Sequence, residues 1–530
     1  MFRDLELRLL PSLATQPDAL RDAAARAAGV SPSRVRGVTA LRRSLDARPR
    51  SPVYQLRVRV WIDEEPRAPE LLELALRDVR SAPPVVVVGA GPAGLFAALR
   101  LIEGGLRPIV LERGKDVRGR RIDVARLSRD GIVNPESNYC YGEGGAGTFS
   151  DGKLYTRSTK RGDVERILQI LVRHGAPADI LVDAHPHIGT NRLPRVVDAI
   201  RRTIVECGGE VRFGARVDGL VREAGAVRGV VLADGERVVA GSVILATGHS
   251  ARDVYAMLDE SGIRLEPKAF AFGVRVEHPQ ALVDSIQYRC ERRPAELPPA
   301  SYSLLRRVDG RGVYSFCMCP GGVICPATTS QDEVVVNGWS PSRRNSRWAN
   351  SGIVVETTIE DARRLCGDGV LAGARLQASI EQRAAEAGGG LAVAPAQRLM
   401  DFVDARASTD LPSCSYPPGI RAAELGDVLP GFAAHALRDG LRLFGERMRG
   451  FLTNDAVVVG VETRTSAPAR IPRDASTGMH PEVRGLFPCG EGAGAAGGIV
   501  SAAMDGERAA AAVLGVPYAR GAEAVSARKA

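Results

Sequence analysis

The first 80 residues show a pattern of apolar and polar positions that differs from the rest of the chain. Apolar residues alternate with polar ones from Leu5 to Leu10 and again from Tyr54 to Ile62, with the period of two that is typical of a half-buried strand. Between them, from Asp18 to Ala28, apolar residues recur at the spacing of an amphipathic helix. The pattern therefore predicts a small α/β unit over residues 1–80, followed by a proline-containing linker.

A second pattern begins at Val85. Consecutive valines indicate a strand buried on both faces, followed by a glycine turn, a helix that ends at Gly104 and a strand that ends at Leu111, which together form a βαβ unit. Beyond Gly262 the sequence is irregular and rich in strand patterns, and a nucleotide-domain pattern returns only at Gly485. We predict an α/β fold in which a mixed α+β substrate domain is inserted into a discontinuous Rossmann-type domain. The predicted boundaries are 84–265 for the first part of that domain, 266–475 for the insertion, 476–520 for the return segment and 521–530 for a tail.

The turn after the valine strand carries the first chemical signal. It reads Gly89-Ala90-Gly91-Pro92-Ala93-Gly94, and Glu112 ends the next strand. In such a turn the first glycine permits a tight bend, the second lets a diphosphate approach the backbone, and the third allows close helix packing. The helix N-terminus adds N–H donors, and an acid at this spacing suits a ribose diol. Strand, turn, helix, strand and acid in this order predict dinucleotide binding, whereas the glycine spacing alone would also fit a structural turn.

Three further segments carry a related signal. The strand that begins at Val243 runs into Ala246-Thr247-Gly248, and a later strand runs into Gly490-Glu491, after which Gly498-Ile499 opens a helix. The glycine-rich loop at 142–147 could present backbone N–H groups to a phosphate or a flavin, or be a plain flexible loop. Each segment alone is ambiguous. The candidate cofactor contacts are Gly89, Gly91, Pro92, Ala93, Gly94, Glu112, Arg113, Gly145, Thr148, Lys153, Val217, Ala246, Thr247, Gly248, Gly490, Glu491, Gly498 and Ile499.

In this order the motifs resemble the FAD-binding motifs of the glutathione-reductase-like flavoprotein superfamily. The runs GEGGAGTFSDGKL from residue 142, LATGHSARDVYAML from 245 and GEGAGAAGGIVSAAMDG from 490 are similar to those of the bacterial FAD-dependent dehydrogenase/oxidoreductase family. The resemblance covers nearly the whole chain and implies a Rossmann-type FAD-binding domain, bound FAD and a redox role. It also implies that Glu112 holds the adenosine ribose, that Glu491 holds the ribitol, and that Gly498 and Ile499 lie near the isoalloxazine.

The chain departs from the family pattern at two tryptophans. Trp339 and Trp348 stand where the resemblance implies Met and Asn, and both lie in one segment of the predicted insertion. A reshaped substrate pocket is one interpretation of this difference, and ordinary core packing is the other.

Five residues are candidates for catalysis. Cys317 and Cys319, in Cys-Met-Cys-Pro-Gly-Gly, would lie in a sharply turning loop on the substrate or flavin side, or be small buried apolar residues. Their spacing is awkward for a disulfide and lacks the two separated pairs of a zinc site, so no metal is predicted. His249 and Arg252 could anchor an anion or exchange a proton, or cap a helix. Lys153 could stabilise a reduced flavin or a phosphate, or be a surface cation.

Charge and cysteine content restrict the partners. The formal net charge is +9, but the 71 basic residues are scattered and nearly all arginine, which is typical of a solvated surface and disfavours a nucleic-acid partner. Nine unevenly spaced cysteines and a charged start predict a cytoplasmic protein, and glycines interrupt the longest apolar stretch, so no membrane association is expected. Because no second dinucleotide fingerprint follows a strand, the expected partners are a small-molecule substrate and NAD(P)H or an external electron carrier. The pattern specifies no oligomeric state.

The prediction is therefore an enzyme, an FAD-dependent oxidoreductase that transfers hydride between flavin N5 and an organic substrate, in specialised or secondary metabolism. Net charge and the lysine-containing glycine loop motivate an alternative, a flavin-dependent tRNA- or nucleic-acid-modifying enzyme, which would bind tRNA in a salt-dependent way. A third reading, a non-catalytic flavin redox sensor, predicts FAD that is reduced reversibly without an accepted substrate.

Overall fold

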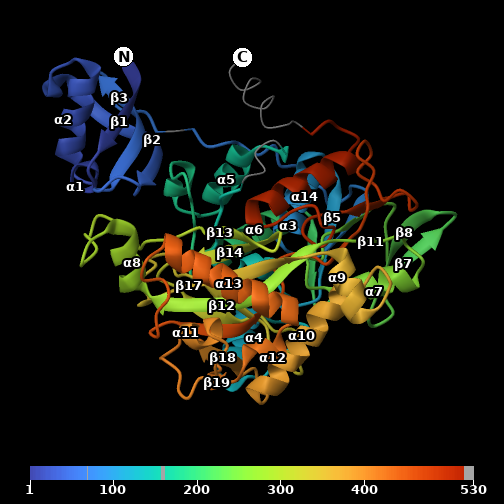
Figure 1. Cartoon of the computed structure of the whole chain (residues 1–530). Helices are drawn as coiled ribbons and strands as arrows, with labels where there is room; N and C mark the ends of the chain where they lie inside the picture. Colours follow the sequence, from blue (N-terminus) through green and yellow to red (C-terminus); the bar gives the residue numbers. More distant parts are fainter. Residues whose placement is uncertain (69, 157–160, 519–530) are drawn as a thin grey trace.

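Most of the strands belong to a five-stranded parallel sheet and a seven-stranded, mostly antiparallel sheet. The structure is a computed structural model that describes residues 1–68, 70–156 and 161–518, so the predicted tail at 521–530 lies outside the described residues. None of the helices within those ranges is long and apolar enough to cross a membrane. In Figure 1 the helices labelled α3, α5, α6 and α14 lie above the long strands labelled β12 and β17, and the dark blue N-terminal unit stands to one side.

The N-terminal unit is a three-stranded antiparallel sheet covered by a helix. Its strand order is β1-β3-β2, and α2 packs against the sheet through Ala24 and Ala25, which are fully buried. The sequence pattern misses β2, because register shifts after Val35 and after Ala40 interrupt its alternation of apolar and polar positions. The elements are β1 (Phe2–Leu9), α1 (Pro11–Ala14), α2 (Pro17–Ala28), η1 (Pro32–Arg34), β2 (Val35–Asp46) and β3 (Val53–Ile62).

Polar contacts tie this unit to the rest of the chain. The backbone N–H of Arg43 donates to the carbonyl oxygen of Val182 at 2.9 Å, and the Arg43 guanidinium bonds the Asp183 carboxylate at 2.7 Å. The Tyr54 hydroxyl donates to the carbonyl oxygen of Glu296 at 3.3 Å. The N-terminal sheet is therefore anchored through Arg43 of β2 and Tyr54 at the start of β3.

The parallel sheet has the order β22-β10-β4-β5-β6. Its central strand β4 packs Val85 and Val87 into one apolar cluster and Val86 and Val88 into another, which explains the unbroken valine run. Strand β22 comes from the far end of the chain, so the predicted discontinuous Rossmann-type fold is confirmed. The strands are β4 (Pro84–Val88), β5 (Arg107–Glu112), β6 (Glu210–Phe213), β10 (Val243–Leu245) and β22 (Leu486–Pro488).

Two helices that open at glycine motifs pack closely on one face of this sheet. A Cβ atom at Gly506 of α14 would lie 2.0 Å from the carbonyl oxygen of Ala93 in α3, so only glycine permits this approach. The opposite face is covered by the hairpin strands β7 to β9 and by α7, which contributes the buried Tyr255 and Leu258. These elements, with α5 and α6 beside the helix pair, are α3 (Pro92–Glu103), α5 (Val164–Arg173), α6 (Leu193–Glu206), β7 (Val217–Glu223), β8 (Ala226–Leu232), β9 (Arg237–Val239), α7 (Arg252–Glu260) and α14 (Ile499–Val513).

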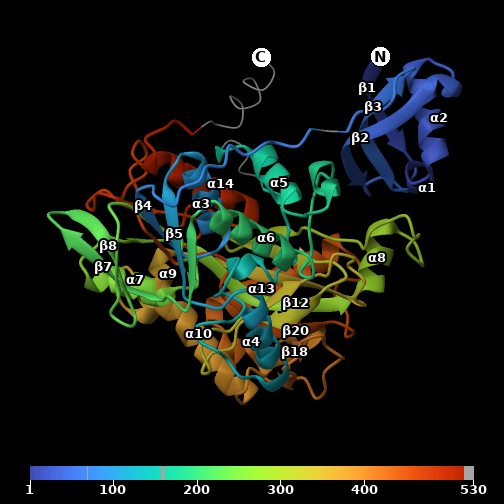
Figure 2. The ribbon, with the colours of Figure 1, turned by 180° about the vertical axis from the view of Figure 1, so that it is seen from behind.

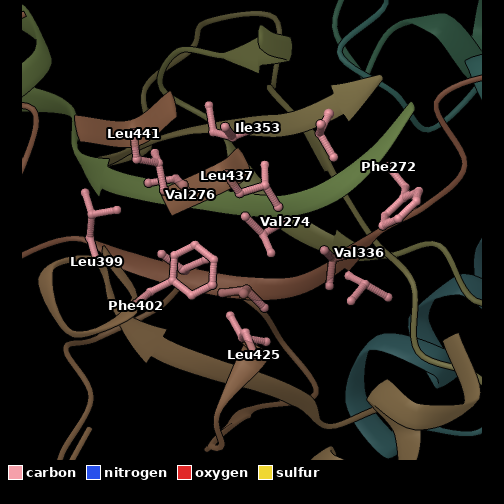
Figure 3. Packing of buried hydrophobic residues seen from close by; sticks show 14 of the residues in the cluster. Phe272, Val274, Val276, Val336, Ile353, Leu399, Phe402, Leu425, Leu437 and Leu441 are labelled. Carbon is pink, nitrogen blue, oxygen red and sulfur yellow. The ribbon is translucent and has the colours of Figure 1, made fainter. Parts of the chain in front are cut away.

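The seven-stranded sheet has the order β13-β14-β17-β12-β20-β18-β19, and only β18 and β19 pair in parallel. Its core includes Leu437 and Leu441 of α13 beside Val274 and Val276 of β12, as Figure 3 shows. The strands and the two longest helices are β12 (Phe270–Pro279), β13 (Leu305–Val308), β14 (Arg311–Cys319), β17 (Trp348–Thr357), α10 (Ala372–Gly388), β18 (Ala394–Arg398), β19 (Ile420–Ala422), α13 (Gly431–Arg447) and β20 (Val457–Glu462).

The chain passes from the parallel sheet to the larger sheet and back at neighbouring points, because β11 (Glu266–Pro267) pairs with β21 (Ala469–Arg470). Figure 2 shows the two bodies from behind, with α4 beside the larger one. The remaining elements are α4 (Val117–Asp130), η2 (Gly145–Gly147), η4 (Ala178–Leu181), α8 (Gln280–Tyr288), β15 (Val323–Pro326), β16 (Val336–Trp339), α9 (Ile359–Cys366), α11 (Leu399–Val403) and α12 (Leu425–Val428).

One buried arginine holds the loop that follows α4. The Arg120 side chain is completely buried and donates to four backbone carbonyl oxygens, those of Asn138, Tyr139, Gly142 and Glu143, at 2.7 to 3.2 Å. Burial lowers the pKa of its guanidinium to about 10, which leaves it charged at neutral pH. A fixed cation therefore sets the path of residues 138–143.

We expect Arg120→Met to lower the free energy of unfolding by at least about 3 kcal/mol, because it leaves several buried carbonyl groups without a donor. The matched control is Arg121→Met, on the same helix but exposed, which we expect to change stability by less than about 0.5 kcal/mol. Urea unfolding of both variants measures the difference, and equal stabilities would contradict the role given to Arg120.

Candidate functional site

A large cavity lies at the edge of the parallel sheet where β4, β5 and β10 end. It contains about 1390 Å³ of empty space, open solvent included, and its wall also includes the start of α14 and the loop that follows α4. The structure therefore brings together segments from both ends of the chain. The candidate residues that line it are Gly89, Gly91, Pro92, Ala93, Glu112, Arg113, Gly145, Lys153, Val217, Ala246, Thr247, Gly248, His249, Cys317, Glu491, Gly498 and Ile499.

Three glycines shape the turn between β4 and α3, and a side chain is disfavoured at each of them for a different reason. Gly89 has a φ of +103°, and a Cβ atom there would lie 2.5 Å from the carbonyl oxygen of Ala246. A Cβ atom at Gly94 would lie 1.9 Å from the carbonyl oxygen of Gly89, so this glycine serves helix packing behind the cavity wall. Gly91 differs, because it lines the cavity and a Cβ atom there would meet only the Cα atom of Gly145, at an ordinary contact distance of 3.8 Å. Gly91 is thus the point where a ligand can approach the backbone.

Glu112 joins three segments of the cavity wall. One carboxylate oxygen accepts the backbone N–H groups of Gly114 and Gly142, each at 2.9 Å, and the other accepts that of Ala90 at 2.9 Å. A carboxylate offers roughly four acceptor positions. Glu112 therefore keeps acceptor capacity for a ligand hydroxyl while it holds the turn, the end of β5 and the glycine loop together.

Several of the candidate cofactor contacts lie behind the wall. The hydroxyl of Thr148 is buried and donates to the carbonyl oxygen of Glu143 at 2.8 Å, within the glycine loop. The backbone N–H of Gly490 donates to Asp505 at 2.8 Å, which fixes the turn before α14. These residues support the shape of the cavity from outside it.

The cavity has polar groups that suit a flavin dinucleotide. Thr247 lines it, and the buried hydroxyl of this residue has no hydrogen-bond partner among the residues that the structure describes. The N-terminus of the twelve-residue helix α3 opens onto it at Gly91 and Pro92. A free hydroxyl, a glycine gap at a helix N-terminus and an acid with spare acceptor capacity fit the diphosphate and hydroxyl groups of FAD.

A second, smaller cavity adjoins the first. It contains about 480 Å³ of empty space and shares Cys140, Ala146, Ser150 and His249 with the larger cavity. Its other walls come from the loop that follows α4, from β15, β16 and the residues beside them, and from the end of β20, and most of them are apolar or aromatic. They are Tyr139, Phe149, Cys325, Ala327, Val335, Val336, Asn337, Gly338, Glu462 and Arg464.

His249 lies between the two cavities. Its Nδ1 atom is 2.8 Å from the Ser250 hydroxyl, and its Nε2 atom is 3.7 Å from a carboxylate oxygen of Glu491. Burial lowers the pKa of the imidazole below its ordinary value, and Arg464 and Arg252 act in the same direction against Glu491. His249 is therefore neutral at neutral pH and is able to accept or donate a proton at Nε2.

Arg252, by contrast, is held by two carboxylates outside both cavities. Its guanidinium bonds Glu333 at 2.9 Å and Glu381 at 2.7 Å, and Arg464 bonds the same two acids. These four side chains form a charge network between α7, α10 and the end of β20. An anion-anchoring role for Arg252 would require it to leave this network.

Lys153 connects the cavity to the two cysteines. Its Nζ atom lies 3.7 Å from Cys317 Sγ and 3.6 Å from Cys319 Sγ. Cys317 lines the cavity, and Cys319 is completely buried behind it.

The two tryptophans that depart from the family pattern do not line either cavity. Neither Trp339 nor Trp348 is among the residues that border the two cavities described above.

Sequence reasoning missed the buried charged pair behind the thiols. Arg275 of β12 is fully buried and forms an ion pair with Glu462 at the end of β20, and it bonds Asn350 Oδ1 at 2.7 Å. The sequence feature that could have indicated the pair is a charged residue within each of two strand patterns, Arg275 in VRVEHP and Glu462 in VVVGVET. Such residues are expected to pair when the strands are buried, but the sequence does not specify which acid meets which base.

Comparisons with known proteins agree with this geometry. Residues 84–137 match a family described as FAD binding domain, and residues 269–465 match one described as FAD-dependent protein, C-terminal domain-like. Residues 1–61 match a domain of unknown function. FAD is therefore the cofactor of this chain.

Solved structures with a similar arrangement are distant. CtdE in complex with FAD is 11% identical, with 82% of this chain and 84% of that chain covered and a TM-score of 0.31. A geranylgeranyl bacteriochlorophyll reductase-like protein of Thermoplasma acidophilum is 14% identical, with 81% and 78% covered and a TM-score of 0.33.

A protein of Clostridium beijerinckii is much more similar in sequence. It is described as uncharacterised and is 42% identical over 451 residues, which are 84% of this chain and 83% of the relative. Identity at this level extends across both the parallel-sheet and the seven-stranded bodies. The chain therefore belongs to the same family as this Clostridium relative.

Proposed function

We propose that the protein is an FAD-dependent oxidoreductase that transfers hydride between the flavin and a small organic substrate bound in the second cavity. One observation carries the proposal: the second cavity adjoins the cofactor cavity, and His249 forms part of both walls. A substrate there would meet the cofactor beside a neutral imidazole. Bound FAD supplies two-electron chemistry at the N5 atom of its ring.

The chain's own residues would orient the cofactor along the first cavity. The N-terminus of α3 at Gly91 faces the place for the diphosphate, and the spare acceptor capacity of Glu112 suits the adenosine ribose. Glu491 accepts the backbone N–H of Gly498 and borders the cavity at its other motif, where the ribitol would lie. The ring would then extend toward Gly498 and Ile499, on the side of His249 and Lys153.

The second cavity favours a mainly apolar substrate with a polar group. Tyr139 and Phe149 provide aromatic walls, and Glu462 and Asn337 provide polar atoms at one end. One carboxylate oxygen of Glu462 has no partner within the described part of the chain. We infer that this oxygen binds a donor group of the substrate, while His249 moves the proton that accompanies hydride transfer.

The proposal is tested by anaerobic stopped-flow mixing of the purified holoprotein with NADH, NADPH and a panel of small organic donors. Loss of the visible absorbance of oxidised flavin that saturates with the concentration of one donor class supports an oxidoreductase. Reduction of the flavin by NADPH at a rate that saturates with NADPH concentration would identify nicotinamide as the donor, although the chain has no second dinucleotide-binding fingerprint that follows a strand. Flavin that is bleached by dithionite alone would instead support the redox-sensor interpretation.

We expect Gly91→Ala to weaken FAD binding by at least about tenfold, or about 1.4 kcal/mol, while leaving the free energy of unfolding of the apoprotein within about 0.5 kcal/mol. The reason is that the added methyl group meets no protein atom closer than 3.8 Å and projects into the cofactor cavity. Fluorescence titration with FAD and urea unfolding measure the two quantities. The control is Gly241→Ala, an exposed glycine with open space around it, and unchanged affinity in Gly91→Ala would contradict the placement of the diphosphate.

We expect Ala327→Leu to retain bound FAD but to slow donor-dependent bleaching by roughly tenfold or more, because the larger side chain fills the second cavity and displaces the substrate. The matched control is Ala125→Leu on the exposed face of α4. Bleaching at the wild-type rate in Ala327→Leu would move the substrate out of the second cavity.

A further inference from the structure

Strand β14 ends in a bulge at the cavity wall. Phe316 pairs with Gly352 and Cys319 pairs with Asn350, so Cys317 and Met318 together oppose a single residue of β17. Cys317 has a φ of +47°, a left-handed conformation that is uncommon for a residue with a Cβ atom. Bulges re-aim side chains beside active sites, and here the bulge places the Cys317 side chain on the cofactor cavity.

Cationic groups hold this bulge from two sides. The Lys153 ammonium lies 3.7 Å from the sulfur of Cys317 and 3.6 Å from that of Cys319, which brings both sulfurs to one point. From the opposite side the Arg275 guanidinium donates to the carbonyl oxygen of Cys317 at 2.8 Å and lies 3.7 Å from Cys319 Sγ. Two thiols with two cations around them form an environment that stabilises a thiolate.

The two thiols differ in accessibility. Cys317 is half-buried and borders the cavity, whereas Cys319 is 0% exposed and donates to the carbonyl oxygen of Cys317 at 3.2 Å. A separate hydrogen bond between the two thiol side chains lowers the pKa of the Cys317 thiol well below its ordinary value, and Lys153 and Arg275 act in the same direction against burial. The same bond and burial raise the pKa of Cys319. Deprotonation is thus favoured at the accessible sulfur over the buried one.

Acids near the pair prevent an excess of positive charge. Asp151 lies 3.4 Å from Lys153 and 3.2 Å from Arg344, and Glu462 is paired with Arg275. Burial raises the pKa of Glu462 to about 7. The charged and titratable groups that surround Cys317 are Lys153 and Asp151 from the loop before α5, Arg275 from β12, Cys319 from β14 and Glu462 from β20.

We propose that Cys317 and Cys319 form a redox-active dithiol that reduces a small organic disulfide bound against Cys317 in the cofactor cavity. A Cys-x-Cys spacing is awkward for a disulfide in a regular strand, but here the bulge and Lys153 bring the two thiols together. This proposal rests on the proposed oxidoreductase function, because the two electrons that restore the dithiol come from the reduced flavin. It adds a second substrate to that function: the hydride donor lies in the second cavity, and the disulfide that finally takes the two electrons lies against Cys317 in the cofactor cavity. Cys317 is the catalytic nucleophile, Cys319 is the resolving thiol, and Lys153 is a positioning residue.

The exchange balances in two steps. The Cys317 thiolate attacks one sulfur of the disulfide, so that a mixed disulfide forms, the sulfur–sulfur bond of the substrate breaks, and the leaving thiolate takes the proton of Cys319. Cys319, now a thiolate, attacks the sulfur of Cys317, forms the internal disulfide and releases the second substrate thiolate, which is protonated by solvent. Two electrons and one proton then return the internal disulfide to one thiolate and one thiol.

The test uses holoprotein and hydroxyethyl disulfide as the probe, with iodoacetamide quenching and peptide mass mapping. We expect wild type to yield a 317–319 peptide that is lighter by two hydrogens and resists alkylation. Cys319→Ser should instead trap the hydroxyethyl adduct on Cys317, and Cys317→Ser should yield neither product. Cys207, a partly exposed thiol that does not line the cavity, serves as the internal reference in every sample.

The positioning role of Lys153 has its own readout. We expect Lys153→Met to slow alkylation of Cys317 at neutral pH by roughly tenfold and to shift its pH profile upward, because the thiolate loses its nearest cation. The control Lys115→Met removes a lysine that pairs with Asp123 instead and should leave the profile unchanged.

Flavin absorbance and donor-dependent bleaching are recorded on the same samples. If bleaching persists but no 317–319 disulfide forms, the dithiol proposal is overturned and the oxidoreductase function stands. If the disulfide forms but no donor bleaches the flavin, the oxidoreductase function fails separately. Alkylation of wild-type Cys317 no faster than that of Cys207 also overturns the proposal, and this measurement requires no variant to fold.

Discussion

The cavity depends on one carboxylate. Glu112 accepts backbone N–H groups from the turn after β4, from the end of β5 and from the glycine loop, and these three segments form one end of the cofactor wall. A buried acid that is satisfied by backbone donors fixes the separation of those segments more strictly than apolar packing can, because hydrogen bonds to a charged group are directional and short. Arg120 continues this constraint by holding the carbonyl groups of the same loop from behind.

Buried charges also connect the two bodies of the chain. Arg464 of the segment after β20 and Arg252 of α7 share Glu333 and Glu381, so the parallel-sheet body and the seven-stranded body meet through a network in which each charge has an opposite partner. A buried ion pair adds little net stability over apolar packing, but removing one partner is costly. The network therefore favours one relative placement of the two bodies, and that placement forms the second cavity.

Local sequence was sufficient to predict the cofactor and part of the fold. The valine run, the Gly89–Gly94 turn and Glu112 lie within about 25 residues and have fixed roles in one βαβ unit, so their order predicts both the fold and the dinucleotide. Strand β2 was not predicted, because its bulges break the alternation of apolar and polar residues on which strand prediction depends. Thr148 and Arg252 were recognised as polar residues near motifs, but their partners, Glu143 and the acids of the charge network, could not be read from spacing.

The sequence alone determined the βαβ unit and its glycine turn, and so predicted a dinucleotide at the end of the valine strand, because the glycines, the helix N-terminus and the acid lie close together in the chain. Only the tertiary structure decided what would face that cofactor. Lys153, Cys317 and Arg275 come from a loop and two strands far apart in the chain, and Glu462 comes from a fourth element. Their meeting depends on the register of the β12, β14 and β17 ladder and on its bulge, where a shift of one residue would turn the thiols away from the cavity.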